Sequence, residues 1–106
     1  MTIRIGSESF TSKKQACARA AEVLHGHVPM QPITGRDGRF VASLFALHPH
    51  APEKAAPGVH CFVVGPSVHG RGVNLFVVRT DGTFDDFSIR RAVAAAPVTT
   101  GEGTSS

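Results

Sequence analysis

Short stretches of alternating polar and apolar residues run through the chain, and a period of two predicts β-strands. Residues 1–5 alternate in this way and predict a first strand. Two longer runs rich in β-forming residues, 59–64 and 73–79, are separated by a glycine-rich loop too long for a tight turn. Residues 83–87 continue the pattern, so we expect an antiparallel meander. The run 59–64 is apolar on both faces except at His60, which predicts a central position in the sheet.

The last two runs are joined by the pair Asp81-Gly82. This pair accepts the positive φ angles of a tight two-residue hairpin turn, which we therefore predict here. Residues 85–88, Asp-Asp-Phe-Ser, then supply capping oxygens before an apolar helix face over residues 89–93. The chain is predicted to change from strand to helix within a few residues of the turn.

Apolar positions at helical spacing predict two further helices in the N-terminal half. The first spans about residues 13–25, with Ser12 at its cap. The second is expected to have Asp37 as its cap and to end at His48, because Pro49 disfavours helix there.

Two segments are predicted to lie outside regular structure. Residues 48–58 contain three prolines and predict an ordered or extended loop, a natural place for exposed function. Residues 97–106 have almost nothing to bury and are expected to be a disordered tail. The sequence thus predicts one α+β domain over residues 1–96, with an antiparallel sheet of three to four strands packed by two to three helices.

Length and composition restrict the class of protein. A chain of 106 residues with 42% hydrophobic and 18% charged residues is expected to form one domain. Its apolar runs are too short to span a bilayer, and its N-terminus does not resemble a secretion signal, so we expect no membrane association and a cytoplasmic location. Cys17 and Cys61 form no CxxC pair and are expected to be small buried side chains rather than a disulfide.

The charge balance allows a nucleic-acid partner without requiring one. Eleven Lys and Arg against eight Asp and Glu give a net charge of +3. The absence of Trp and Tyr counts mildly against single-strand binding by base stacking. The cations that stand out are Lys13, Lys14, Lys54, Arg71, Arg79, Arg90 and Arg91. A merely solvated basic face is the alternative interpretation.

Catalytic and metal chemistry find little support in the sequence. The His-x-His pairs at residues 25–27 and 48–50 lack the acidic or cysteine partners of a zinc site, so we expect neither metal nor cofactor. Asp85 and Asp86 are adjacent and would point to opposite faces of a strand, which favours helix capping over paired acid/base work. No serine lies in a nucleophile motif. A hydrolase that uses His48 is the least favoured hypothesis.

A family resemblance rests on a combined signature near the end of the domain. Arg-x-Asp-Gly at residues 79–82 is followed by Asp-Phe-Ser at residues 86–88. The other residues that carry the resemblance are Ser12, Lys13, Lys14, Asp37, Phe40, His48, Pro49, Lys54, Gly58, Phe62 and Phe76. Over about residues 2–93 the chain resembles the DCL (defective chloroplasts and leaves) domain family, known from a plant plastid protein, the C-terminus of a plant-specific RNA polymerase large subunit and small stand-alone bacterial proteins.

This resemblance implies an association with ribosomal RNA maturation or with RNA-polymerase machinery. We therefore expect a non-catalytic module that binds RNA, or alternatively a protein-interaction domain that binds no nucleic acid. The expected nucleic-acid contacts are Lys13, Lys14, His48, Lys54 and Arg79. Arg79 has an alternative role in an ion pair with Asp81 or Asp86 across the hairpin. The expected structural residues are Asp37, Gly58, Asp81, Gly82, Asp86, Phe87 and Ser88.

Overall fold

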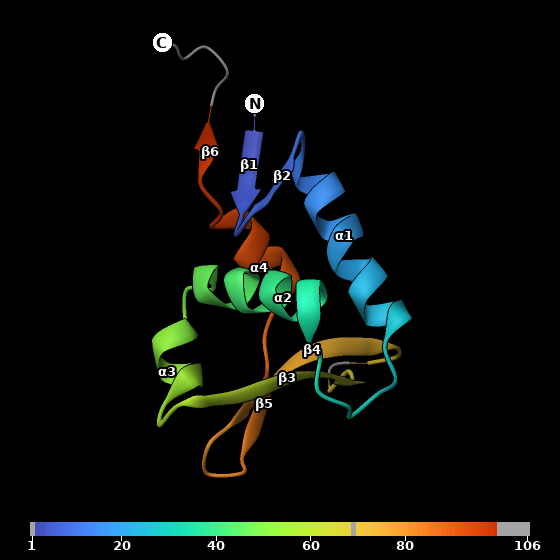
Figure 1. Cartoon of the computed structure of the whole chain (residues 1–106), viewed down its shortest axis with the longest axis vertical. Helices are drawn as coiled ribbons and strands as arrows, with labels where there is room; N and C mark the ends of the chain where they lie inside the picture. The colour runs from blue at the N-terminus through green and yellow to red at the C-terminus, as the bar shows by residue number, and fades with distance from the viewer. Residues whose placement is uncertain (1, 69, 100–106) are drawn as a thin grey trace.

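In the computed structural model, which describes residues 2–68 and 70–99, two antiparallel sheets lie on either side of one central helix (Figure 1). The first sheet has the order β2-β1-β6 and contains β1 (Thr2–Ile5), β2 (Glu8–Phe10) and β6 (Val98–Thr99). The second has the order β3-β4-β5 and contains β3 (Val59–Pro66), β4 (Val73–Arg79) and β5 (Phe84–Asp86). The α+β class is confirmed, but the expected single sheet is divided into two.

The division begins with a tight reversal after the first strand. Gly6 has a φ of +63°, and this left-handed conformation lets β1 fold back antiparallel on β2. The two strands pair Ile3 with Phe10 and Ile5 with Glu8. Strand β1 therefore pairs with the next strand in the sequence and does not join the meander.

Four helices cover the sheets in the described part of the chain: α1 (Lys13–Gly26), α2 (Gly35–Leu47), α3 (Ala51–Ala55) and α4 (Ile89–Ala94). The predicted cap of α1 is confirmed, because Ser12 Oγ accepts a hydrogen bond from the Gln15 amide at 3.1 Å. The cap of α4 is also confirmed, since Ser88 Oγ accepts from the Arg91 amide at 3.2 Å. No helix among the described residues is both long and apolar enough to cross a bilayer.

Two expectations about helices are wrong. Helix α2 starts at Gly35 with Thr34 as its N-cap, so Asp37 lies inside the first turn and does not cap it. The segment 48–58 is not wholly a loop, because α3 forms within it. Pro52 occupies the first turn of α3, where a missing amide donor costs nothing.

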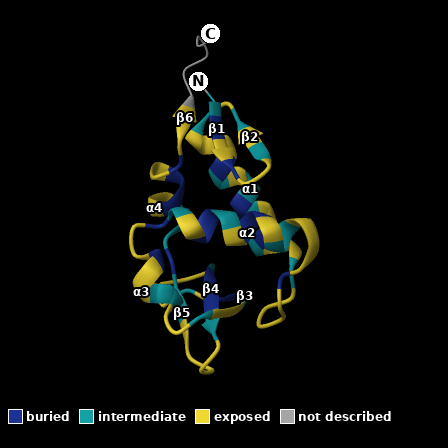
Figure 2. Ribbon diagram, turned by 60° about the vertical axis from the view of Figure 1, so that its left-hand side comes forward, coloured by how far each residue is buried: buried dark blue, intermediate teal, exposed yellow. Residues whose placement is uncertain are grey.

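The main core lies where α2 packs between the two sheets (Figure 2). Helix α2 buries Phe40, Val41, Leu44 and Phe45, and α1 buries its small face of Ala16, Ala20 and Val23. The strands contribute Ile3, Ile5, Phe62, Val64, Leu75 and Val77. Phe87, between β5 and α4, is 1% exposed and packs edge-on against Phe45, which fixes the point where α4 leaves the sheet.

Strand β4, and not β3, is central in the second sheet, so the prediction for residues 59–64 is wrong. The outer edge of β3 is covered by the loop before α2. In this loop the Met30 amide donates to the Val64 carbonyl at 2.8 Å, and the Ile33 amide donates to the Phe62 carbonyl at 2.8 Å. This cover explains how an edge strand can have the apolar composition of a central one.

The β4–β5 hairpin is confirmed, but its turn is longer than two residues. The Arg79 amide donates to the Thr83 carbonyl at 2.7 Å, and the Gly82 amide donates to the Arg79 carbonyl at 3.0 Å. Gly82 has the predicted positive φ, +88°, whereas Asp81 does not. This pattern is the three-residue hairpin loop in which a glycine closes the turn as a bulge.

The end of the domain also differs from expectation. Val98 pairs with Ile3, and Thr99 pairs with Thr2, so the first part of the predicted disordered tail forms a strand. Val98 supplies the backbone partner that β1 needs on its second edge, which composition alone does not reveal. Residues 100–106, on which the rest of that prediction falls, lie outside the described residues.

Candidate functional site

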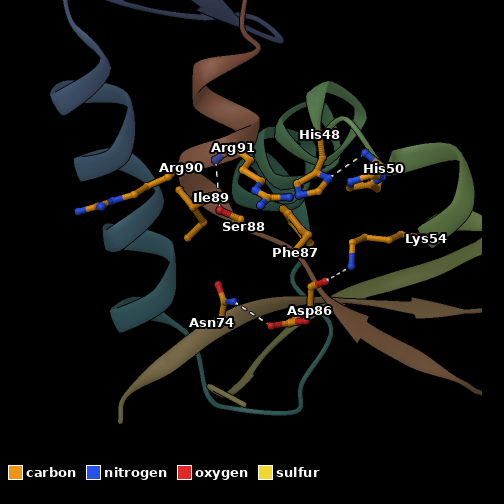
Figure 3. A pocket seen from close by; sticks show the side chains of 10 residues that line it. All are labelled: His48, His50, Lys54, Asn74, Asp86, Phe87, Ser88, Ile89, Arg90 and Arg91. Carbon is orange, nitrogen blue, oxygen red and sulfur yellow. Dashed lines mark hydrogen bonds between the residues drawn. The ribbon is translucent and has the colours of Figure 1, made fainter. Parts of the chain in front are cut away.

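A cavity of about 480 Å³ opens where the end of α2, helix α3 and the start of α4 meet the ends of β4 and β5 (Figure 3). Its lining residues are His48, His50, Lys54, Asn74, Asp86, Phe87, Ser88, Ile89, Arg90 and Arg91. Three of them are lysine or arginine and two are histidine, against one carboxylate, Asp86. The lining therefore carries an excess of positive charge.

His48 lines this cavity and is only 4% exposed. It follows the last residue of α2, and its ring packs edge-on against Phe87 with centroids 6.3 Å apart. The His50 amide donates to His48 Nδ1 at 3.0 Å. Because Nδ1 is the acceptor, the proton of the neutral ring is assigned to Nε2.

Burial lowers the pKa of the His48 imidazole below its usual 6.5. The positive charges of Lys54, His50 and Arg91 lower this pKa further, and the carboxylate of Asp85 opposes them. His48 is therefore a neutral hydrogen-bond donor at physiological pH.

Lys54 reaches the cavity from α3. Its ammonium donates to the Asp86 carbonyl at 2.8 Å and to Asp85 Oδ2 at 3.0 Å. Burial alone would raise the pKa of Asp85, but the hydrogen bond and charge of Lys54, with Arg79, hold that pKa below its usual 3.8. Asp85 and Asp86 lie in β5 and tie α3 to the hairpin, so the expectation that they cap a helix is wrong.

Arg90 and Arg91 stand in the first turn of α4, directly after its cap. Both are exposed, and neither side chain makes a hydrogen bond or ion pair within residues 2–68 and 70–99. Figure 3 shows the Arg91 side chain extending toward the His48 ring, consistent with the effect of its charge on the pKa of His48. On the far side of the cavity, Asn74 Nδ2 lies 3.5 Å from Asp86 Oδ2.

Arg79 lies next to the cavity but not in its lining. Its guanidinium donates to the Lys54 carbonyl at 2.9 Å and to Thr83 Oγ1 at 2.8 Å, and it lies 4.0 Å from Asp85 Oδ2. The alternative of an ion pair across the hairpin is thus correct in kind, although the partner is Asp85. Asp81 instead accepts hydrogen bonds from the amide and hydroxyl of Thr83.

Lys13 and Lys14 begin α1 beside β2, in the upper part of Figure 1, whereas α3 lies in the lower half. The structure therefore brings together only part of the expected binding set. His48 and Lys54 share the cavity, Arg79 adjoins it, and the two lysines of α1 lie far from it. The Gly58 carbonyl accepts a hydrogen bond from the Thr80 amide at 2.9 Å beside the hairpin turn.

A second charged cluster lies between β2, α1 and α2. Arg19 donates to Glu8 Oε1 at 2.8 Å and to Asp37 Oδ1 at 2.7 Å, and its guanidinium lies over the Phe40 ring. Asp37 Oδ2 lies 2.8 Å from His27 Nε2. These contacts explain why Asp37 does not cap α2: its carboxylate joins two helices instead.

The described residues contain no group of three or more His, Cys, Asp or Glu side chains arranged to hold a metal ion. Of the two histidine pairs, His27 contacts Asp37 and His50 contacts Glu53 at 3.2 Å. Cys17 and Cys61 are both free and half-buried.

A separate groove of about 320 Å³ lies on the sheet face turned away from α2. Its lining is almost wholly apolar: Met30, Gly65, Pro66, Val68, Phe76 and Phe84. Phe84 is 57% exposed and meets Phe76 edge-on at 5.9 Å. Among the described residues, none that lines the groove offers a charged side chain to a ligand.

Arg90 and Arg91 stand out in the sequence only as basic residues, and no sequence pattern assigns His50 or Asn74 to a binding site. The available signal was local: two arginines follow a serine cap, so both lie on the first turn of a helix that leaves a buried strand. Asn74 carried no such signal, because its place at the cavity depends on the pairing of β4 with β5.

Together, the fold and the cavity define a small α+β domain with a basic polar pocket. Residues 21–93 match the family described as "Protein of unknown function (DUF3223)", and the chain belongs to this family. The matched region contains every residue of the cavity lining.

Two similar proteins extend this comparison. The chain is 39% identical over 74 residues to the DNA-directed RNA polymerase IV subunit 1 of Arabidopsis thaliana. This match covers 70% of the chain but only 5% of that subunit. The solution NMR structure of an uncharacterized protein from Rhodospirillum rubrum is also similar, with a TM-score of 0.76 and 30% identity over 85% of this chain and 86% of that one.

Proposed function

We propose that the chain is a cytoplasmic, non-catalytic binding module that associates with RNA through the basic cavity. The observation that carries the proposal is the placement of Lys54, Arg90 and Arg91 around one cavity whose described lining residues include a single carboxylate. Cations that line one cavity suit the phosphate groups of a nucleic-acid backbone.

The comparisons support a nucleic-acid context. A relative that is 39% identical over 74 residues is a subunit of an RNA polymerase. The resemblance to the DCL domain would add a role in ribosomal RNA maturation or in transcription, and we include that role in the proposal. Within the expected binding set we retain His48 and Lys54, add Arg90 and Arg91, and assign Arg79 to the support of α3.

The proposal is tested by titrating labelled single-stranded and duplex RNA with the wild-type protein at two salt concentrations. We expect the affinity to fall as salt rises, and Arg91→Glu to weaken binding of all sequences alike, because phosphate contacts do not read bases. Lys14→Glu is the matched control, since it reverses a charge in the first turn of α1, outside the cavity lining. Binding no tighter than that of a similarly basic control protein would refute the proposal.

A protein-interaction domain is the second candidate, and the exposed apolar groove around Phe84 favours it. The same titration separates the two, because a protein-interaction domain should bind RNA no more tightly than a similarly basic control protein does. A hydrolase that uses His48 as its base is not favoured, since Nδ1 already accepts the His50 amide and Nε2 carries the proton.

A further inference from the structure

The buried His48 ring has one nitrogen without a partner. Nδ1 accepts the His50 amide at 3.0 Å, but no hydrogen bond engages Nε2 within the described part of the chain. A polar hydrogen on a side chain that is 4% exposed is costly to leave unpaired. The other groups that line the cavity show what kind of partner it suits.

That partner must be an acceptor. Arg91, toward which the unpaired side of the ring is turned in Figure 3, offers only donors, and its side chain is unpaired among the described residues. Lys54 has used two donors on Asp85 and on the Asp86 carbonyl, and its ammonium has three. A single group that accepts several hydrogen bonds and carries negative charge would satisfy all three side chains together.

We infer that His48 Nε2–H and the Arg91 guanidinium, with Lys54 beside them, form a seat for one phosphate group. The inference rests on the proposed function and names the part of the ligand that the cavity holds. His48 acts in it as a neutral donor, so it adds a directed hydrogen bond where Arg91 adds charge. The phosphate is either at the end of an RNA strand or within its backbone.

Two substitutions separate the roles of the two ring nitrogens. In His48→Asn the amide oxygen takes the place of Nδ1 and keeps the acceptor for the His50 amide, but nothing reaches the position of Nε2. In His48→Gln the longer side chain brings an NH₂ donor to the position of Nε2. The inference therefore predicts that His48→Asn weakens phosphate binding by roughly tenfold, whereas His48→Gln retains most of it.

The experiment is an NMR titration of the ¹⁵N-labelled wild-type protein and both variants with inorganic phosphate, followed by RNA carrying a 5′-phosphate or a 5′-hydroxyl. We expect inorganic phosphate to shift the His48 Nε2 signal of the wild-type protein, a readout that does not depend on how well either variant folds. Preference for the 5′-phosphate strand identifies the end of the strand as the source. Equal binding of both strands, with the same His48 shift, identifies the backbone.

The outcomes distinguish this seat from the broader proposal. RNA binding with no change at His48 Nε2, or with His48→Asn as tight as wild type, would overturn the seat and leave the RNA-binding module standing. A His48 shift with phosphate, but no binding of either RNA, would support the seat and refute the RNA module.

Discussion

Two clusters of charged side chains, one around Arg19 and one around His48, use similar residues in different ways. Arg19 is 14% exposed and donates to both Glu8 and Asp37 within 2.8 Å. Arg91 also belongs to a helix, yet its side chain makes no hydrogen bond or ion pair within the described residues. The first cluster holds β2, α1 and α2 together, whereas the second leaves donors directed into a cavity.

The difference indicates which cations can serve a ligand. A guanidinium that already satisfies two carboxylates contributes to the free energy of folding, and a ligand would have to displace those partners. A ligand that binds a guanidinium on the rim of a cavity has no such partners to displace. Lys54 is intermediate, because Asp85 balances part of its charge while it still lines the cavity.

The largest effect is expected from removing the Arg19 guanidinium. Arg19→Met should lower the free energy of unfolding by about 2–4 kcal/mol, because Glu8 and Asp37 lose the cation nearest to them while Glu8 stays largely buried. Arg36, which is exposed and lies 3.5 Å from Glu8, replaces only part of that charge. Arg91→Met, the matched change at the cavity, should cost no more than about 0.5 kcal/mol. Urea unfolding of both variants checks the comparison, and equal losses would contradict it.

The next largest effect is expected in the pH dependence of the free energy of unfolding, which should differ between the two clusters. Hydrogen bonds from Arg19 to Glu8, and from His27 and Arg19 to Asp37, lower the pKa values of these carboxyls below their usual 4.5 and 3.8. Groups with a lowered folded pKa stabilise the fold above their unfolded pKa and lose that contribution as the pH falls through the folded value. Arg19→Met should therefore reduce the loss of stability below about pH 4.5, as measured by urea unfolding at several pH values.

The titration of His48 should change the free energy of unfolding in a higher pH range than that of Glu8 and Asp37. Its folded pKa lies below the usual 6.5, so the unfolded chain takes up the proton first as the pH falls. The free energy of unfolding should then decrease as the pH falls from about 6.5 to the folded pKa of His48, because over this range the unfolded chain binds a proton that the buried ring does not. His48→Gln, which does not titrate, should remove this part of the decline. An unchanged profile would show that His48 is not the titrating group.

The smallest effect is expected on RNA affinity, when the Lys54 ammonium loses its carboxylate partner Asp85. Asp85→Asn removes the carboxylate 3.0 Å from the Lys54 ammonium without changing the size of the side chain. The charge of Lys54 would then be fully available to a phosphate, and RNA affinity at low salt should rise roughly twofold. Fluorescence titration against Asp81→Asn, an exposed carboxylate in the same hairpin, provides the control. A gain of the same size in both variants would indicate net charge alone.

The sequence predicts those features of the fold that depend on residues close together in the chain. The caps Ser12 and Ser88 and the positive φ of Gly82 follow from short-range patterns, and the structure confirms them. Asp37 looked like a cap for the same local reason. Its actual partners, Arg19 and His27, are 18 and 10 residues away and come close only when α1 packs beside α2.

The site was predictable only in part. His48 and Lys54 were identified through the family resemblance, and the structure places both in the cavity. Arg90 and Arg91 could not be separated from Lys13 and Lys14 by sequence, because all four stand at the start of a helix. What separates them is the position of each helix start relative to α3, a tertiary property.

Arg90 and Arg91, which have no partner among the described residues, are proposed to bind RNA phosphates, and the salt dependence of RNA binding tests this claim. The slope of log affinity against log salt should be compared for wild type, Arg90→Gln/Arg91→Gln and Lys13→Gln/Lys14→Gln, which lose the same two charges. With single-stranded RNA, the arginine pair should make the slope shallower by about 1.4, since each phosphate contact contributes roughly 0.7. The lysine pair should leave it unchanged. Equal slopes in the two double variants would contradict the claim.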